Sequence, residues 1–263
     1  VKEYQRGLKC DKHNVNLHNS LGVTWAMMNK LSPALQSFIN ALALDDCNFM
    51  ALYNLGLGEQ ARNRQAEALA YMEKALQYYS EEEGGPELVN DLTLQLGILC
   101  CEIGRYQDAL SYLIPWQKKN SQDHSAGRVH YYLGKAHHAL HDNRQAMTTL
   151  QRALRFDEFD DRAMNLLGRV YLDEKEGDQI ALSLCRKSVE LEPANRRYML
   201  NFAEVLLQCG LFHEARENLH RCLRTRDCKT EAQLLLGESY TSEAQHKRAR
   251  KWYEKVVEQE TCH

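Results

Sequence analysis

Four histidines that stand close together in the sequence are the residues best suited to metal chemistry. They are His130, His137, His138 and His141, and the second and fourth are four residues apart, on one face of a helix. Metal-dependent hydrolases of the H-E-x-x-H type also place a glutamate between the histidines as a general base, and this cluster has none. We therefore expect packed or solvated histidines and no metal site.

The nine cysteines do not form a ligand pattern either. No C-x-x-C pair occurs among them, and an odd number of scattered cysteines is typical of reduced thiols in a cytosolic protein. The phosphate-binding patterns G-x-x-x-x-G-K-[ST] and G-x-G-x-x-G are also missing from the sequence. The sequence thus predicts a cytoplasmic protein that is not an enzyme and that uses no cofactor.

Composition excludes two further classes of partner. The net charge is −3 and the isoelectric point about 6.4, so the chain has no overall basic footprint for nucleic acid. No apolar run approaches the length of a membrane span, and no signal peptide is visible at the start. Val1 is not an initiator methionine, which favours a piece of a longer protein.

A repeat with steps of 34 to 41 residues organises the whole chain. A large apolar residue followed by Gly or Ala recurs seven times, at Leu21-Gly22, Leu55-Gly56, Leu96-Gly97, Leu133-Gly134, Leu167-Gly168, Phe202-Ala203 and Leu236-Gly237. In the first period Ala34 and Ala41 follow on a second apolar stripe. Self-similarity at a fixed period of this size predicts stacked structural repeats.

Each period reads as a helical hairpin. The apolar residues fall on helical stripes, and the small residues let two helix axes approach closely. Between the two stripes of a period stand residues that tolerate a left-handed backbone and suit a helix C-terminus, namely Asn29, Asn63, Gly104, His141, Gly177 and Gly210. Ser32-Pro33 then suits the start of the second helix in the first period.

The array resembles a tetratricopeptide repeat (TPR) array over nearly its whole length. The resemblance implies an all-α, right-handed superhelical solenoid of antiparallel helix hairpins. We predict one array over residues 1–263, with a half-repeat at 1–13 and repeats at roughly 15–48, 49–82, 90–124, 127–160, 161–195, 196–229 and 230–263. His130 and His137 then occupy positions where such repeats place packing residues.

The resemblance also implies a concave groove lined by the first helix of each repeat. In the first three repeats the groove positions are largely apolar and give the candidates Val23, Met50, Tyr53, Asn54, Leu57, Leu94 and Ile98. A contiguous apolar patch of this kind marks an interaction site. The alternative is additional core.

In repeats four to six the groove positions become basic. The candidates there are Arg128, Tyr131, Lys135, Arg162, Asn165, Arg169, Arg197 and Asn201. Arg recurs at the second position of three consecutive repeats, which favours an acidic segment in the groove. The alternative is ordinary surface charge, paired with Glu204 and neighbouring acids.

The leading hypothesis is a non-catalytic protein-interaction scaffold that binds a peptide segment of apolar and acidic character. A clamp for a C-terminal carboxylate is not expected, because Asn54 alone matches its pattern in the first three repeats. One alternative is a regulatory or spacer array within a larger multidomain protein. Another is self-association through the ends of the solenoid, where Trp252 and Val257 lie near an end without a polar cap.

Two irregularities interrupt the period. Residues 80–86 form an acidic stretch punctuated by Gly and Pro, which predicts an inserted loop. Pro115 stands inside the second helix of the third repeat, where the missing N–H and the steric clash predict a kink or an early stop.

Overall fold

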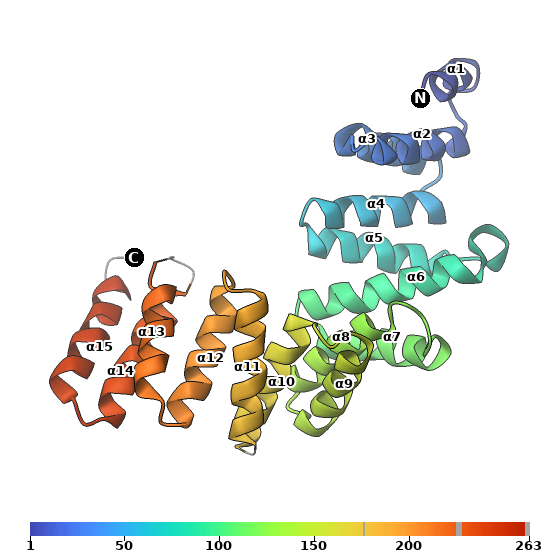
Figure 1. Ribbon diagram of the computed structural model, residues 1–263. Helices are drawn as coiled ribbons and strands as arrows, with labels where there is room; N and C mark the ends of the chain where they lie inside the picture. The colour runs from blue at the N-terminus through green and yellow to red at the C-terminus, as the bar shows by residue number, and fades with distance from the viewer. Residues whose placement is uncertain (176, 225–227, 261–263) are drawn as a thin grey trace. The chain divides into compact units, whose positions relative to one another are not determined.

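The structure, a computed structural model, describes residues 1–175, 177–224 and 228–260 (Figure 1). These ranges contain fifteen α-helices and no β-strand, which confirms the prediction of an all-α fold. The contacts between Cα atoms divide the chain into two compact parts, Val1–Asp123 and His124–His263. Each part is described by itself below.

The N-terminal part is built of helices that pack in consecutive pairs (Figure 1). Its helices are α1 (Lys2–Cys10), α2 (Val15–Met27), α3 (Leu31–Leu44), α4 (Phe49–Ala61), α5 (Gln65–Gln77), α6 (Glu81–Glu102) and α7 (Tyr106–Lys119). The first helix of each pair also contacts the first helix of the next pair, so α2, α4 and α6 lie in succession.

The C-terminal part repeats this arrangement. Its helices are α8 (Ala126–Ala139), α9 (Asn143–Phe156), α10 (Asp161–Glu174), α11 (Asp178–Leu191), α12 (Arg196–Gln208), α13 (Phe212–Cys222), α14 (Lys229–Ser242) and α15 (His246–Glu260). Within it α8, α10, α12 and α14 contact one another in turn. We call these four the inner helices.

Close approach in six of the seven hairpins depends on one contact between a glycine and the facing helix, and the hairpin of α12 and α13 has Ala203 at the same position. A Cβ atom added to Gly134 of α8 would lie 2.5 Å from Cγ of Leu150 in α9, closer than real Cβ contacts allow. The same clash, with the side chain sixteen or seventeen residues further on, arises at Gly22, Gly56, Gly97, Gly168 and Gly237. The recurring glycine therefore sets the distance between the two helices of a hairpin, as the sequence pattern predicted.

The turns between paired helices adopt the left-handed conformation expected from the sequence. All six residues predicted for it have positive φ: Asn29, Asn63, Gly104, His141, Gly177 and Gly210. Lys175 and Ala244 also have positive φ, at 55° and 56°, which their residue types did not indicate. Alanine and lysine have no preference for the left-handed conformation, so the geometry of the hairpin imposes it on these two residues.

Ala244→Gly is expected to stabilise the fold by about 0.5–1 kcal/mol, because glycine adopts positive φ without a steric penalty. Thermal unfolding followed by circular dichroism should show a higher midpoint. Ala139→Gly is the matched control, since it makes the same change within helix α8 and should lower the midpoint. A lower unfolding midpoint in both variants would contradict the interpretation that the positive φ of Ala244 is strained.

The prediction of an inserted loop at residues 80–86 is only partly right. Helix α6 begins at Glu81, but its backbone is non-helical at Gly85, with φ 66° and ψ 163°, so two helical segments meet there at a kink. The Tyr79 hydroxyl donates a hydrogen bond of 2.9 Å to the carbonyl oxygen of Gly85 and fastens this break to the end of the preceding repeat. The additional residues therefore form a short helical segment that Gly85 separates from the rest of α6. The side chains of residues 81–84 lie outside those that the structure describes.

Of the two effects predicted for Pro115, a kink or an early stop, the early stop is wrong, because α7 continues to Lys119. The next residue, Trp116, is 4% exposed and donates a hydrogen bond of 3.0 Å from Nε1 to the carbonyl oxygen of Asn90 in α6. Asn120 at the C-cap donates to both the Asn90 side chain and the Trp116 carbonyl oxygen, at 2.7 and 2.9 Å. These contacts hold the last turn of α7 despite the proline.

His130 is a packing residue, as expected. It is 4% exposed, and its ring stacks on Phe156 with the centroids 5.8 Å apart. Burial lowers the pKa of His130, and the charge of Arg152 lowers it further. In the unfolded chain the imidazole therefore takes up a proton at a higher pH than it does in the folded chain.

The fold should lose stability as the pH falls through the ordinary histidine range, because the unfolded state then binds more protons than the folded state. This loss should be smaller in His130→Leu, measured as the change in denaturant midpoint between pH 7.5 and pH 5. His141→Asn is the control, because His141 is exposed in a left-handed turn. An equal pH dependence in His130→Leu and the wild type would contradict the role of the buried imidazole.

Candidate functional site

The inner helices of the C-terminal part carry an ordered series of charges. The second and ninth positions of repeats beginning at residues 127, 161, 196 and 230 are, in turn, Arg128 and Lys135, Arg162 and Arg169, Arg197 and Glu204, and Glu231 and Glu238. We call these eight residues the charge ladder. It changes from two cations on α8 and two on α10 through one of each sign on α12 to two anions on α14.

Two ion pairs join neighbouring inner helices of the ladder. Arg169 of α10 pairs with Glu204 of α12, and Arg197 of α12 pairs with Glu231 of α14 at 2.6 Å. The pair of Arg197 is largely exposed, since 64% and 54% of the two side-chain surfaces are accessible, so its contribution to stability is small. The interpretation as surface charge paired with Glu204 and neighbouring acids thus describes Arg169 and Arg197.

The cations on α8 have no such partner. Arg128 lies over the ring of Tyr132 at 5.8 Å, and neither it nor Lys135 forms an ion pair within the described part of the chain. Arg162 of α10 stacks on Tyr131 at 4.9 Å and has a longer contact of 3.4 Å with Asp160. Among the described residues, the cations of the ladder without an ion pair are therefore Arg128 and Lys135 of α8.

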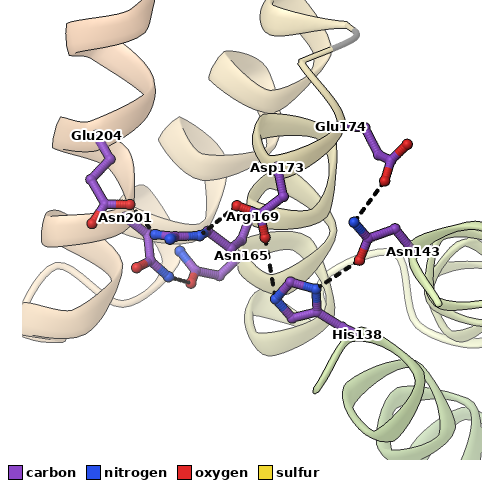
Figure 2. Close-up of polar contacts among 8 residues, drawn as sticks. All are labelled: His138, Asn143, Asn165, Arg169, Asp173, Glu174, Asn201 and Glu204. Carbon is purple, nitrogen blue, oxygen red and sulfur yellow. Dashed lines mark hydrogen bonds and ion pairs between the residues drawn. The ribbon is translucent and has the colours of Figure 1, made fainter. Parts of the chain in front are cut away.

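Arg169 is the centre of a polar network between the inner helices (Figure 2). Besides Glu204 it contacts Asp173 at 3.2 Å, and Asp173 lies 3.6 Å from Nε2 of His138 on α8. His138 in turn contacts Asn143 at 3.1 Å. Figure 2 shows these side chains directed toward one another from three inner helices and the start of α9.

The two predicted asparagines differ in accessibility. Asn165 is 4% exposed; its amide donates to Ser188 at 3.0 Å, and its carbonyl oxygen accepts a bond of 2.6 Å from Asn201. Asn201 is only half-buried. The Asn165 side chain is therefore enclosed by its neighbours, whereas the Asn201 side chain remains partly accessible.

A cavity of about 460 Å³ opens between α10, α12 and α14. Leu172, Leu207 and Leu235 supply its apolar wall. Its charged lining contains Arg169 with its partners Asp173 and Glu204, together with Lys175 and Glu238. The site thus combines an apolar surface with charges of both signs, and the sequence did not indicate this cavity.

The apolar candidates of the N-terminal part differ strongly in exposure. Val23 is 38% exposed, and Met50, Asn54 and Leu57 are half-buried. Tyr53, Leu94 and Ile98 are buried, and the Tyr53 hydroxyl donates to Asp91. Burial and the Asp91 carboxylate both raise the pKa of Tyr53, which keeps this hydroxyl protonated. The accessible apolar surface is accordingly smaller than the sequence pattern suggested.

The described ranges contain no group of three or more His, Cys, Asp or Glu residues arranged to hold a metal ion. Burial raises the pKa of the Cys185 thiol to about 12 and those of Cys100 and Cys222 to about 11, which keeps them protonated and unreactive at neutral pH. No helix there has the length and apolarity that crossing a membrane requires.

Comparison with known proteins agrees with this architecture. Residues 50–86 and 230–260 each match a family described as tetratricopeptide repeat. The chain has the fold of a tetratricopeptide repeat array. No curated protein sequence matches it significantly.

Solved TPR structures share the fold at low sequence identity. YrrB, described as a TPR protein with an unusual peptide-binding site, is 20% identical with a TM-score of 0.62, over 74% of this chain and 95% of YrrB. PilF of Pseudomonas aeruginosa is 17% identical with a TM-score of 0.65, over 87% of this chain and 98% of PilF. A TPR protein of Parabacteroides merdae is 15% identical with a TM-score of 0.63, over 98% of this chain and 93% of that protein.

Proposed function

We propose that this TPR array is a non-catalytic protein-interaction module that binds a segment of a partner protein along the inner helices of its C-terminal part. TPR proteins commonly act as interaction modules, and YrrB is described as having a peptide-binding site. The observation that carries the proposal is the unpaired positive charge of Arg128 and Lys135 beside the Arg162–Tyr131 stack.

This surface suits acidic side chains of an extended segment. Guanidinium and ammonium groups donate charge-assisted hydrogen bonds to carboxylates. Tyr131 and Tyr132, whose rings lie 5.2 Å apart, add rigid aromatic surface beside these cations. Arg197 contributes less than the sequence suggested, since Glu231 already compensates its charge. In the N-terminal part, Val23, Met50 and Leu57 separately offer accessible apolar surface to a partner.

The test is a selection of random twelve-residue peptides displayed on phage against the immobilised chain. We expect enrichment of acidic peptides, and synthetic versions should bind at least about tenfold more weakly to Arg128→Glu/Lys135→Glu, a loss of about 1.4 kcal/mol or more. Binding should also weaken as salt is added, because these cations are partly exposed.

Arg144→Glu/Arg155→Glu is the matched control. It makes the same change in net charge on exposed positions of α9, outside the inner helices. Equal losses in the two double variants would show a general charge effect and contradict the assigned surface. The absence of any enriched peptide would also contradict it.

A further inference from the structure

The charge ladder changes sign along its length, from cations on α8 to anions on α14. Each internal pair joins an arginine to a glutamate on the next inner helix: Arg169 to Glu204, and Arg197 to Glu231. Because each of these arginines pairs with a glutamate on the next inner helix, the charges in the middle of the ladder neutralise one another. Unpaired charges therefore remain at its two ends.

The free negative end is Glu238 on α14. Its side chain is exposed and forms no ion pair or hydrogen bond with the described residues, and it lines the cavity with Leu207 and Leu235. The other unpaired charge in this cavity is Lys175, at the C-cap of α10. Helix α12 contacts both α10 and α14 and separates these two charges.

The surface around Glu238 has the features that a long basic side chain requires. Leu207 and Leu235 are half-buried and offer apolar area for the aliphatic stem of a lysine or arginine. The Glu238 carboxylate would accept hydrogen bonds from the cationic head. Glu204 lines the same cavity but is already held by Arg169.

We propose that the segment bound by the inner helices is bipolar, with its acidic residues over α8 and a lysine or arginine in the cavity beside Glu238. This inference rests on the proposed function and specifies the chemistry and orientation of the same ligand. The reverse placement would set like charges against each other at both ends, and such contacts select against wrong partners.

The geometry also sets the spacing within the ligand. Helices in direct contact lie about 8–10 Å apart, so the three steps from α8 to α14 cover roughly 24–30 Å. An extended chain advances about 3.3 Å per residue, which gives roughly seven to nine residues between the acidic group and the base.

The experiment uses the same random twelve-residue phage library on the full chain and two variants. Peptides selected by the wild type should combine an acidic cluster with a lysine or arginine about seven to nine residues away. Among peptides selected on Glu238→Lys, the lysine or arginine should be at least fivefold less frequent, and an acidic residue should stand in its place. Selection on Arg128→Glu/Lys135→Glu should retain the base and lose the acidic cluster.

Glu190→Lys, an exposed position on α11, is the control for the change in net charge and should leave the selected peptides as in the wild type. Circular dichroism checks that each variant is folded, and Glu238→Gln should weaken the preference for the base without reversing it. If Glu238→Lys leaves the base unchanged while the α8 variant loses the acidic cluster, the bipolar ligand is wrong and the proposed function stands. If neither variant alters the selected peptides, or no peptide is enriched, both proposals are wrong.

Discussion

Leu150→Ala is expected to lower the free energy of unfolding by about 2–5 kcal/mol. Leu150 is fully buried at the contact between α8 and α9, in a cluster that includes Leu167 and Val170 of α10. Truncation removes its apolar surface and leaves a cavity that the packed helices cannot fill. The loss should appear as a lower midpoint in guanidinium unfolding followed by circular dichroism.

Gly134 lies opposite Leu150, so a double variant at these two positions tests how the two helices of the hairpin pack. Gly134→Ala alone should destabilise by about 1–3 kcal/mol, because its Cβ would lie 2.5 Å from Cγ of Leu150. In the double variant that methyl group enters the space vacated by Leu150, so the two losses should sum to more than the observed loss. Gly97→Ala, which crowds Leu113 in the other part of the chain, should instead be additive with Leu150→Ala. Additivity in both pairs would contradict direct packing of Gly134 against Leu150.

Trp116→Ala is the second substitution for which we expect a large effect, about 3–5 kcal/mol. The indole is almost fully buried, and its N–H reaches the backbone of Asn90 on the neighbouring helix at 3.0 Å. Loss of this side chain also removes the anchor that keeps α7 helical beyond Pro115. Unfolding midpoints and the helical signal at 222 nm, which is where circular dichroism reports α-helix, are the measurements.

Trp116→Phe separates the two contributions. It keeps much of the buried aromatic surface and removes the donor, so we expect a smaller loss of about 1–3 kcal/mol from the unpaired carbonyl oxygen of Asn90. Trp252→Phe is the control, since Trp252 is half-buried and its ring carries Lys255 at 3.9 Å. A loss at Trp252 equal to that at Trp116 would contradict the anchoring role of the Asn90 contact.

The repeat architecture could be predicted from the sequence because each hairpin is specified locally. The glycine at the eighth position meets a side chain within the same repeat, as Gly134 meets Leu150, and the left-handed turn at Asn29 depends on one residue. Such features recur once in each repeat, so they can be recognised in the sequence by their periodicity. The short helical segment before Gly85 was not predictable in this way, because it occurs in one repeat only and does not recur with the period.

The candidate site could be predicted only in part. The sequence indicated which positions line the inner helices, but not which cations are compensated. Whether a cation is paired depends on the residue one repeat further on. Arg197 meets Glu231 there, whereas Lys135 meets no carboxylate. The burial of Ile98 and Leu94 was likewise hidden, because an apolar residue at a groove position is equally compatible with a binding surface and with additional core.

The contact pattern of the helices has a consequence for how the chain reaches its native state. Within each part, every helix contacts only helices one or two places away along the chain. The sequence separation of native contacts is therefore short, and chains of low contact order fold quickly because little loop entropy is lost before contacts form. Folding can begin at any hairpin and spread to its neighbours.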